Sequence, residues 1–184
     1  DQETLDHWAR YARIHVALAP YWTGLAEVAH ATGLAIWRPL AFADPSDEAL
    51  RSVADEVMVG DGVLVAPVQT KGATSREVIL PAGDWYPWAA GGAIAGGKTL
   101  HVDAPRGEIP VFARAGAVVP TYPDGVETLV REPSSAAGPV DDRVVMIFTG
   151  ADGAFAEADG PSYQLDSSTA APSRSVSRAT SASP

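Results

Sequence analysis

The sequence contains no cysteine and no asparagine among its 184 residues. Without cysteine there can be no disulfide, no zinc-thiolate site and no cysteine nucleophile. Without asparagine there is no Asn-x-Ser/Thr acceptor for N-glycosylation. The four histidines, His7, His15, His30 and His101, include no pair at ligand spacing with a third partner. We therefore expect no metal and no cofactor, and we interpret the histidines as ordinary surface or core residues.

Positive charge is also scarce. The chain has 13 Lys and Arg, of which only Lys71 and Lys98 are lysine, against 23 Asp and Glu, so its net charge is -10 and its pI is about 4.7. Phosphate contacts need clustered Lys and Arg, so we expect neither a nucleic-acid partner nor a membrane partner. No apolar run approaches the roughly 18 residues that a spanning helix needs.

The N-terminus, Asp1-Gln2-Glu3, has no initiator methionine and no signal-peptide layout. We therefore expect the chain to be a piece of a longer protein, and the sequence leaves its cellular location open.

Acidic pairs are present, but none forms a catalytic constellation. Asp47-Glu48 is predicted to open a helix, Asp55-Glu56 to lie inside that helix and Asp141-Asp142 to lie in a loop. Adjacency does not supply the burial and the facing geometry that two catalytic carboxylates need. The glycine-rich loop Gly91–Gly97 lacks the spacing of a phosphate-binding loop. We expect no catalytic residue in this chain.

The first third of the sequence has helical periodicity. Large residues between Trp8 and Ala31 recur at three- and four-residue steps, which places them on one helix face. Thr4 or Asp6 is a candidate N-cap. Pro20 lies inside the pattern, so we predict a kink or break near Leu18 to Pro20. We also predict that Gly33 ends the helix in a left-handed conformation.

A short apolar segment, Leu34–Leu40, follows and predicts a buried strand that contains Arg38. Asp44–Glu48 then predicts a helix entry, with an apolar stripe that ends at Gly60. A charged residue within an apolar strand is rarely buried without a partner. We therefore favour an ion pair of Arg38 with Asp55 or Glu56 over a contact with substrate.

After Gly62 the pattern changes to short β-type runs separated by Gly and Pro, which predicts an antiparallel β-sandwich. The predicted strands are Val63–Val68, Glu77–Leu80, Thr99–Val102, Ile109–Phe112, Ala117–Val119 and, as an addition, Val126–Val130. The fold class predicted is therefore α+β, mostly β.

The last third is sparser in large apolar residues. The Pro- and Ser-rich segment Arg131–Asp142 is interpreted as a linker, and Arg143–Phe148 as the start of another β element. Phe155 and Tyr163 are the large residues that anchor a hairpin after Gly150–Gly153. From Ser167 to Pro184 small polar residues dominate, so we predict a disordered tail.

Several of these segments resemble the C-terminal portion of glycoside hydrolase family 31, the family of α-glucosidases and α-xylosidases. The likeness is carried, in the family's order, by Tyr11-Ala12-Arg13, Leu18-Ala19-Pro20-Tyr21, Ala31-Thr32-Gly33, Arg38-Pro39-Leu40, Asp55–Gly60, Leu64–Val68, Leu80–Tyr86 and Ile109–Ala117. It extends from about Tyr11 to Pro120, and its specificity lies in collinearity rather than in any single motif. Gly150–Tyr163 resembles the family's Asp-Gly hairpin, although Glu157–Pro161 departs from the usual acidic run.

The resemblance implies four parts. Residues 1–60 are the last helix and strand segment of a catalytic (β/α)8 barrel, and residues 61–130 a proximal C-terminal β-sandwich. Residues 131–166 are a linker with a partial distal β domain, and residues 167–184 a tail. It also implies a retaining α-glycosidase, whose two carboxylates stand about 5 Å apart. In the family both lie upstream of this portion, so this chain alone is expected to be inactive, with the rest of the barrel and the parent enzyme's carbohydrate substrate as partners.

Four residues are weak candidates for contact with sugar. Phe42 and Asp44 follow the barrel strand, and active sites of such barrels lie beyond the carboxyl ends of the strands. Trp85 and Trp88 are candidates for aromatic platforms, although an aromatic cluster beside a turn more often fills a core. Two alternatives stay open: a non-catalytic carbohydrate-binding β-sandwich module, and a degraded gene product without a stable core.

Overall fold

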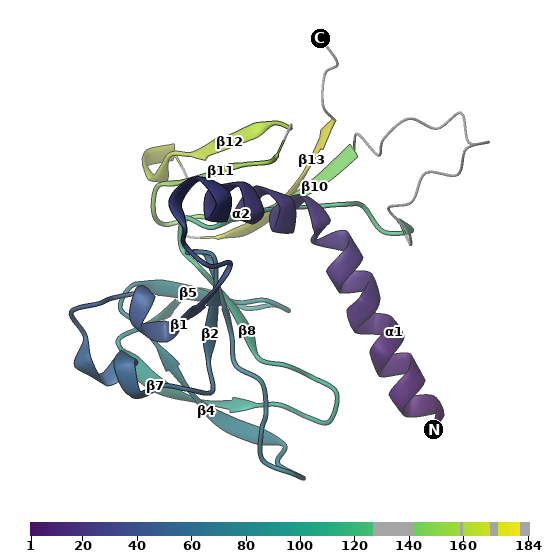
Figure 1. The fold of residues 1–184 in the computed structure, drawn as a ribbon, viewed down its shortest axis with the longest axis vertical. Helices are drawn as coiled ribbons and strands as arrows, with labels where there is room; N and C mark the ends of the chain where they lie inside the picture. The colour runs from purple at the N-terminus through teal and green to yellow at the C-terminus, as the bar shows by residue number, and fades with distance from the viewer. Residues whose placement is uncertain (127–141, 159, 170–172, 181–184) are drawn as a thin grey trace.

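A computed structural model describes residues 1–126, 142–158, 160–169 and 173–180 (Figure 1). These residues form two helices, three short 3-10 turns and thirteen strands. The mostly β character predicted from the sequence is confirmed. Among these residues, no helix is long and apolar enough to cross a membrane.

Two helices open the chain, α1 (Gln2–Ala17) and α2 (Ala19–Thr32), and they meet at Leu18. The predicted break is confirmed, since Pro20 occupies the first turn of α2 where its missing N–H has no helical partner to lose. Gly33 ends α2 at φ 77° as predicted. The predicted N-cap is wrong: Asp1 caps α1 and accepts a hydrogen bond from the Thr4 amide at 2.9 Å.

The largest sheet has six strands, in the order β1-β2-β3-β8-β5-β6, and each neighbouring pair is antiparallel. Its strands are β1 (Trp37–Pro39), β2 (Val57–Val59), β3 (Val63–Val65), β8 (Val111–Arg114), β5 (Asp84–Pro87) and β6 (Ile94–Ala95). β1 lies at an edge and half of the Trp37 side chain is exposed, so this strand is less buried than predicted.

The helix predicted after Asp44 is wrong for most of its length. The structure has two 3-10 turns, η1 (Leu40–Phe42) and η2 (Glu48–Ser52), and then a loop that holds Asp55 and Glu56. β2 follows at once, and its alternating β-branched residues Val57 and Val59 suit a strand better than a helix. The pairing of β2 with β1 and β3 outweighs the apparent helical stripe.

A two-stranded ribbon covers one face of this sheet. β4 (Ser75–Leu80) pairs with β7 (Lys98–Asp103), and its Val78 and Leu80 are fully buried. They pack in one cluster with Leu64, Trp85 and Phe112 of the sheet. The six-stranded sheet and the β4–β7 ribbon are thus two packed β layers, the arrangement that the sequence predicted as a β-sandwich.

The last strands form a three-stranded sheet and a hairpin. β10 (Asp142–Phe148) lies between β9 (Val118–Thr121) and β13 (Arg174–Thr180), while β11 (Gly153–Ala156) pairs with β12 (Ser162–Leu165). The 3-10 turn η3 (Ser167–Thr169) precedes β13. The predicted hairpin is confirmed, with Phe155 directly opposite Tyr163.

One prediction fails in this part of the chain. The tail predicted to be disordered contains β13, which pairs with β10 over seven residues, so backbone hydrogen bonds order a segment that lacks large apolar residues. β9 and β10, on either side of the predicted boundary between the proximal and distal β domains, are neighbours in one sheet. Except for Val126, the predicted strand Val126–Val130 lies outside the described residues, as does most of the linker.

A single apolar cluster joins the helical and C-terminal parts. It contains Tyr21 and Leu25 of α2, Val59 and Tyr86 of the six-stranded sheet, and Phe148 of β10. α2 lies between that sheet and the β11–β12 hairpin (Figure 1). The segment predicted to end a barrel therefore shares its core with the β domain.

Candidate functional site

An apolar groove lies between α1 and the six-stranded sheet. Its walls include Tyr11 and Leu18 from the helix side and Val65, Trp88 and Val111 from the sheet side. Arg10, Asp103 and Glu108 supply charge along its lining. Aromatic faces beside a few polar groups are typical of both ligand sites and protein contact surfaces.

An aromatic stack lies at this groove. The ring centroids of His15 and Trp22 are 5.7 Å apart, and those of Trp22 and Trp37 are 5.9 Å apart with an interplanar angle of 16°. Trp37 is 54% exposed and ends the stack at the solvent. The Trp22 Nε1 is buried and has no hydrogen-bond partner among the described residues, an uncommon situation for a buried donor. The stack gives the groove a rigid aromatic wall.

Tyr11 joins α1 to the loop between β7 and β8 at one end of the groove. Its hydroxyl donates a hydrogen bond to the Gly107 carbonyl at 3.0 Å and accepts one from the Ile109 amide at 3.1 Å. Glu3 and Arg106 form an ion pair beside it, with Oε1 and Nε 3.4 Å apart. These contacts hold α1 against the loop between β7 and β8.

Trp85 and Tyr86 are core residues, which confirms the interpretation favoured from the sequence. Both are fully buried, and their polar atoms are satisfied by backbone: Trp85 Nε1 donates to the Pro81 carbonyl at 2.8 Å and the Tyr86 hydroxyl to Thr149 at 2.9 Å. Trp85 therefore has no free face for a sugar ring. Trp88 is half-buried, packs on Phe148 and also lines the groove.

Phe42 and Asp44 lie on the segment that follows β1. Phe42 is 52% exposed at the end of η1. The Asp44 carboxylate accepts hydrogen bonds from the amide and hydroxyl of Ser46, which lowers the pKa of Asp44 below its usual range. Asp47, rather than Asp44, caps η2 through the Ala49 amide at 2.9 Å. Among the described residues, the carboxylate of Asp44 shares no hydrogen bond with a second carboxylate.

Arg38 is buried and forms an ion pair, as its position in the sequence predicts, but with a different partner. Its guanidinium pairs with Asp61 and its Nε donates to the Ala35 carbonyl at 2.7 Å. Burial, together with the Asp61 carboxylate, raises the pKa of Tyr21, whose hydroxyl donates to the Val59 carbonyl at 3.0 Å. Asp61 lies in the turn between β2 and β3, and no pattern in the sequence marks it as the partner.

Asp55 and Glu56 instead bind Arg76 of β4. Arg76 Nη2 is 2.9 Å from Asp55 Oδ2 and 3.2 Å from Glu56 Oε1, and the Ile79 amide also donates to Glu56 Oε1 at 2.9 Å. The Glu56 side chain is almost fully buried, and its Oε2 has no hydrogen-bond partner within the part of the chain that the structure describes. Burial raises the pKa of Glu56 above its usual range, against the effects of the Ile79 amide and Arg76.

A second buried carboxylate, Glu157, was missed from the sequence. Arg143 Nε contacts its Oε2 at 2.8 Å, and the Tyr163 hydroxyl donates to Oε1 at 2.6 Å. Burial and the bond to Glu157 raise the pKa of Tyr163. The signal for this cluster was weak, because Arg143 lies on β10 and Glu157 in the loop after β11, and only their pairing in space reveals it.

The chemistry available to these groups is limited. Glu56 and Glu157 are each held by an arginine, an arrangement that stabilises a carboxylate, and the Asp55 carboxylate beside Glu56 binds the same arginine. Over the parts of the chain that the structure describes, no group of three or more His, Asp or Glu could hold a metal ion. The concave surface and its aromatic wall are therefore the features that point to a function.

Known proteins share this architecture. Residues 33–119 match the model of the glycosyl hydrolase family 31 C-terminal domain. A 1,6-α-glucosyltransferase from Sporosarcina globispora is 33% identical over 163 residues, which are 85% of this chain and 12% of that protein. A probable glucan 1,3-α-glucosidase from Arabidopsis thaliana is 43% identical over 104 residues, 56% of this chain and 11% of that protein.

A solved structure of a family 31 enzyme is also similar to this chain. The family 31 α-xylosidase from Xanthomonas citri superposes with a TM-score of 0.66 at 38% identity, and the match covers 78% of this chain and 15% of that one. This chain thus spans between a tenth and a sixth of the length of these three relatives.

Proposed function

Because residues 33–119 of this chain belong to the C-terminal domain of glycosyl hydrolase family 31, we propose that the chain is the C-terminal structural part of a retaining α-glycosidase. The parent enzyme hydrolyses O-glycosidic bonds of α-glucosides or related sugars. The observation that carries this proposal is the collinear match to relatives that are named as α-glucosidases, an α-glucosyltransferase and an α-xylosidase.

In this proposal the chain contributes support rather than reacting groups. Residues 1–60 are the end of the catalytic (β/α)8 barrel, and strands β3 to β9 are the sandwich beside it. The strands that follow extend the same core through Phe148. The two carboxylates that a retaining mechanism needs are supplied by the barrel, because the buried carboxylates Glu56 and Glu157 are occupied by arginines. Phe42 is the residue of this chain that we place nearest to the sugar pocket, since it is exposed at the end of η1.

An activity assay tests whether the catalytic carboxylates lie outside this chain. The purified chain, supplied with aryl α-glucosides and aryl α-xylosides, is expected to show no turnover above a heat-treated control. Robust turnover that disappears in Glu56→Gln or Glu157→Gln would refute the proposal, because the site would then lie in this chain.

A second candidate is a carbohydrate-binding β-sandwich module, and one observation favours it. Trp37 and Trp88 line the groove and are exposed or half-buried, whereas Trp85 is unavailable. If this module exists, titration with gluco-oligosaccharides quenches tryptophan fluorescence in the wild-type chain and in Trp8→Phe, but not in Trp37→Phe. A flat titration in all three proteins would exclude it.

A further inference from the structure

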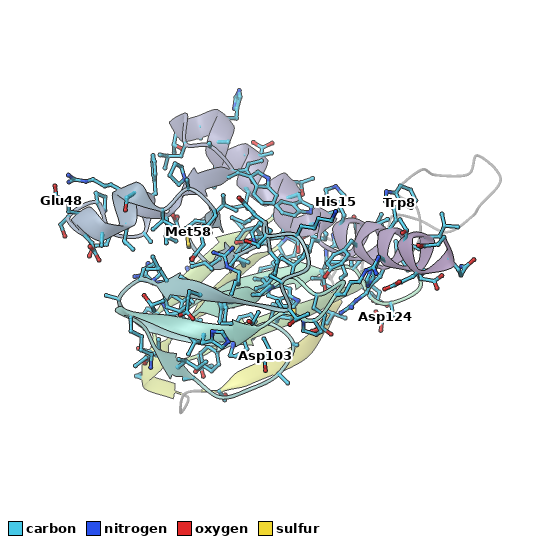
Figure 2. All side chains as sticks on the ribbon, turned by 90° about the horizontal axis from the view of Figure 1, so that it is seen from below. Trp8, His15, Glu48, Met58, Asp103 and Asp124 are labelled. Atoms are coloured by element: carbon cyan, nitrogen blue, oxygen red, sulfur yellow. The ribbon has the colours of Figure 1, made fainter. Side chains whose placement is uncertain are left out.

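A second concavity, which we call the hairpin pocket, lies between α2, the turn that joins β2 to β3, and the β11–β12 hairpin. Its volume is about 810 Å³, within the range of about 300–1,000 Å³ that is usual for small-molecule sites. His15 and Asp103 line the apolar groove described above from its helix side and its strand side (Figure 2). The groove and the hairpin pocket share only Tyr21 among their lining residues, so they are two separate features.

A buried guanidinium with spare donors lines the hairpin pocket. The Arg38 side chain is 4% exposed, its Nε donates to the Ala35 carbonyl at 2.7 Å, and its Nη1 pairs with Asp61. Nη2 carries two of the five N–H donors of a guanidinium, and it donates no hydrogen bond within the described residues. Buried donors without a partner are costly, so an oxygen of a bound ligand would lower that cost.

Two carboxylates supply acceptors to the same pocket. The Asp61 side chain is 84% exposed, and its Oδ1 is the atom that pairs with Arg38, which leaves Oδ2 able to accept from a ligand. Asp152 Oδ1 accepts from the amide and the hydroxyl of Ser167 at 2.8 and 2.7 Å, which fixes the direction of this carboxylate. A hydroxyl group both donates and accepts, so a ligand rich in hydroxyls suits this combination of donors and acceptors.

Apolar side chains and bare backbone form other parts of the wall. Val28 of α2 is 40% exposed and Phe155 of β11 is half-buried, and both line the pocket. Gly62, Gly116 and Gly153 contribute backbone without side chains, which leaves space between the turn and the hairpin. Apolar walls with a few placed polar groups are typical of sites that bind small organic molecules.

The charge of the pocket favours a neutral ligand over an anion. Arg38 is opposed by the carboxylate of Asp61, and Asp152 adds a second negative charge. Arg114 also lines the pocket, but its guanidinium lies 5.7 Å from the centroid of the Trp85 ring and donates to the Ala82 carbonyl at 3.1 Å. Since the whole chain carries a net charge of -10, an anion would be repelled, whereas a neutral hydroxyl group would not.

We propose that the hairpin pocket is a binding site for a neutral sugar. Arg38 Nη2 donates to one sugar hydroxyl, and the carboxylates of Asp61 and Asp152 accept from others. Val28 and Phe155 contact the apolar face of the sugar ring. This inference goes beyond the proposed function, because binding here requires no catalytic carboxylate. Each can therefore fail alone: turnover tests the proposed function, and binding of a sugar tests the pocket.

An NMR titration of the ¹⁵N-labelled chain with maltotriose tests the site. The backbone amides of Gly62 and Gly153 report on the hairpin pocket, and the indole N–H groups of Trp37 and Trp88 report on the apolar groove. We expect saturable shifts of the two glycine signals and constant indole signals. Constant glycine signals would overturn the inference, and so would shifts confined to the indoles, which would place the sugar in the groove.

Matched variants connect the binding to the carboxylates. Asp61→Asn and Asp152→Asn each remove one acceptor from the pocket, and we expect each to weaken maltotriose binding by about tenfold or more. Asp47→Asn is the control, because Asp47 also accepts a backbone hydrogen bond, from Ala49, but does not line the pocket. Equal affinity in all three variants would contradict the assignment.

Two further points keep the outcome decisive. Asp61→Asn removes the charge that pairs with the buried Arg38 and can unfold the chain, which the same spectra reveal. Asp152 is exposed, so Asp152→Asn then carries the comparison. Sodium sulfate is titrated against the maltotriose complex, and we expect it to leave the glycine signals in their bound positions. Displacement of maltotriose by sulfate would identify an anion site and overturn the proposal of a neutral sugar.

Discussion

At the scale of single residues, Glu56 combines a structural contact with an energetic cost. Its Oε1 binds Arg76 and the Ile79 amide, but its Oε2 is buried with no partner in the described parts of the chain. A buried charged group with an unpaired oxygen is less favourable than the same group in water. The arginine therefore compensates burial only in part, which is why the pKa of Glu56 stays above its usual value.

This raised pKa predicts how stability depends on pH. The folded chain holds the Glu56 proton to higher pH than the unfolded chain does, so the contribution of Glu56 to stability is fully present below the ordinary value of 4.5 and is lost as pH rises through the folded pKa. Glu56→Gln cannot ionise and should lose that slope. Urea unfolding of both proteins from acid to neutral pH checks this, and the difference between them should favour the variant increasingly with pH.

The difference between the two proteins is the informative quantity. Asp44, Asp152 and Asp166 have lowered pKa values because serine residues donate hydrogen bonds to them, so their contributions run the opposite way and are present in both proteins. A difference that stays constant over the pH range would show that Glu56 has the same pKa in the folded and unfolded chains.

Gly24 is a second residue whose role is visible only in the structure. It lies within α2, and a Cβ at this position would stand 2.6 Å from the Phe155 ring and closer still to the Ala156 carbonyl oxygen. Alanine normally improves a helix interior by about 1 kcal/mol over glycine. Here we expect Gly24→Ala to destabilise the chain by about 1–3 kcal/mol, since overpacking against backbone has no easy relief.

Thermal and urea unfolding measure this effect. Ala29→Gly, in the same helix, provides the control for propensity alone and should cost about 1 kcal/mol. A stabilised Gly24→Ala protein would mean that the hairpin does not approach α2 as closely as the structure has it.

At the scale of elements, local sequence patterns correctly predicted the features that depend on residues a few positions apart. The break at Leu18, the stop at Gly33 and the hairpin of Phe155 and Tyr163 follow from Pro, Gly and turn chemistry within a few positions. Pairing partners distant in sequence were not visible. Val57 and Met58 therefore appeared helical although they pair with β1 and β3, and the partner of Arg38 is Asp61 rather than a residue of a helix that does not form.

Strand β13 is the clearest example of an element whose pairing partner is distant in sequence. Its composition gave no sign of order, yet it pairs with β10 from Arg174 to Thr180. A chain that ends at Thr169 leaves that edge of β10 unpaired. Hydrogen exchange should then show lower protection of those β10 amides that face β13, while the amides of β4 and β7 keep theirs.

The β4–β7 ribbon serves as the internal control because its ladder contacts neither β10 nor β13. Unchanged protection of β10 in the shortened chain would mean that β13 does not pair in solution. A loss of protection throughout the chain would mean instead that β13 is required for the whole fold.

At the scale of the whole molecule, the sequence separated parts that the structure unites. Resemblance to a family divided the chain into a barrel end, a proximal sandwich and a distal part. The candidate site residue Trp85 is the core residue that the sequence favoured, whereas Trp88 is half-buried and lines the groove. The groove and its stack escaped prediction, because His15, Trp22 and Trp37 come from three segments whose packing no local pattern encodes.

One shared core predicts one unfolding transition. Phe148 of β10 is fully buried and its ring lies 5.8 Å from Tyr86 and 6.0 Å from Trp88, both in or beside the six-stranded sheet. Phe148→Ala should therefore destabilise the molecule as a whole, by about 3–5 kcal/mol. Tryptophan fluorescence, which reports the sheet and helices, and far-UV circular dichroism, which reports all strands, should shift together. If β10 instead belonged to a separate distal domain, the variant would split the transition and leave the fluorescence midpoint where it is in the wild-type chain.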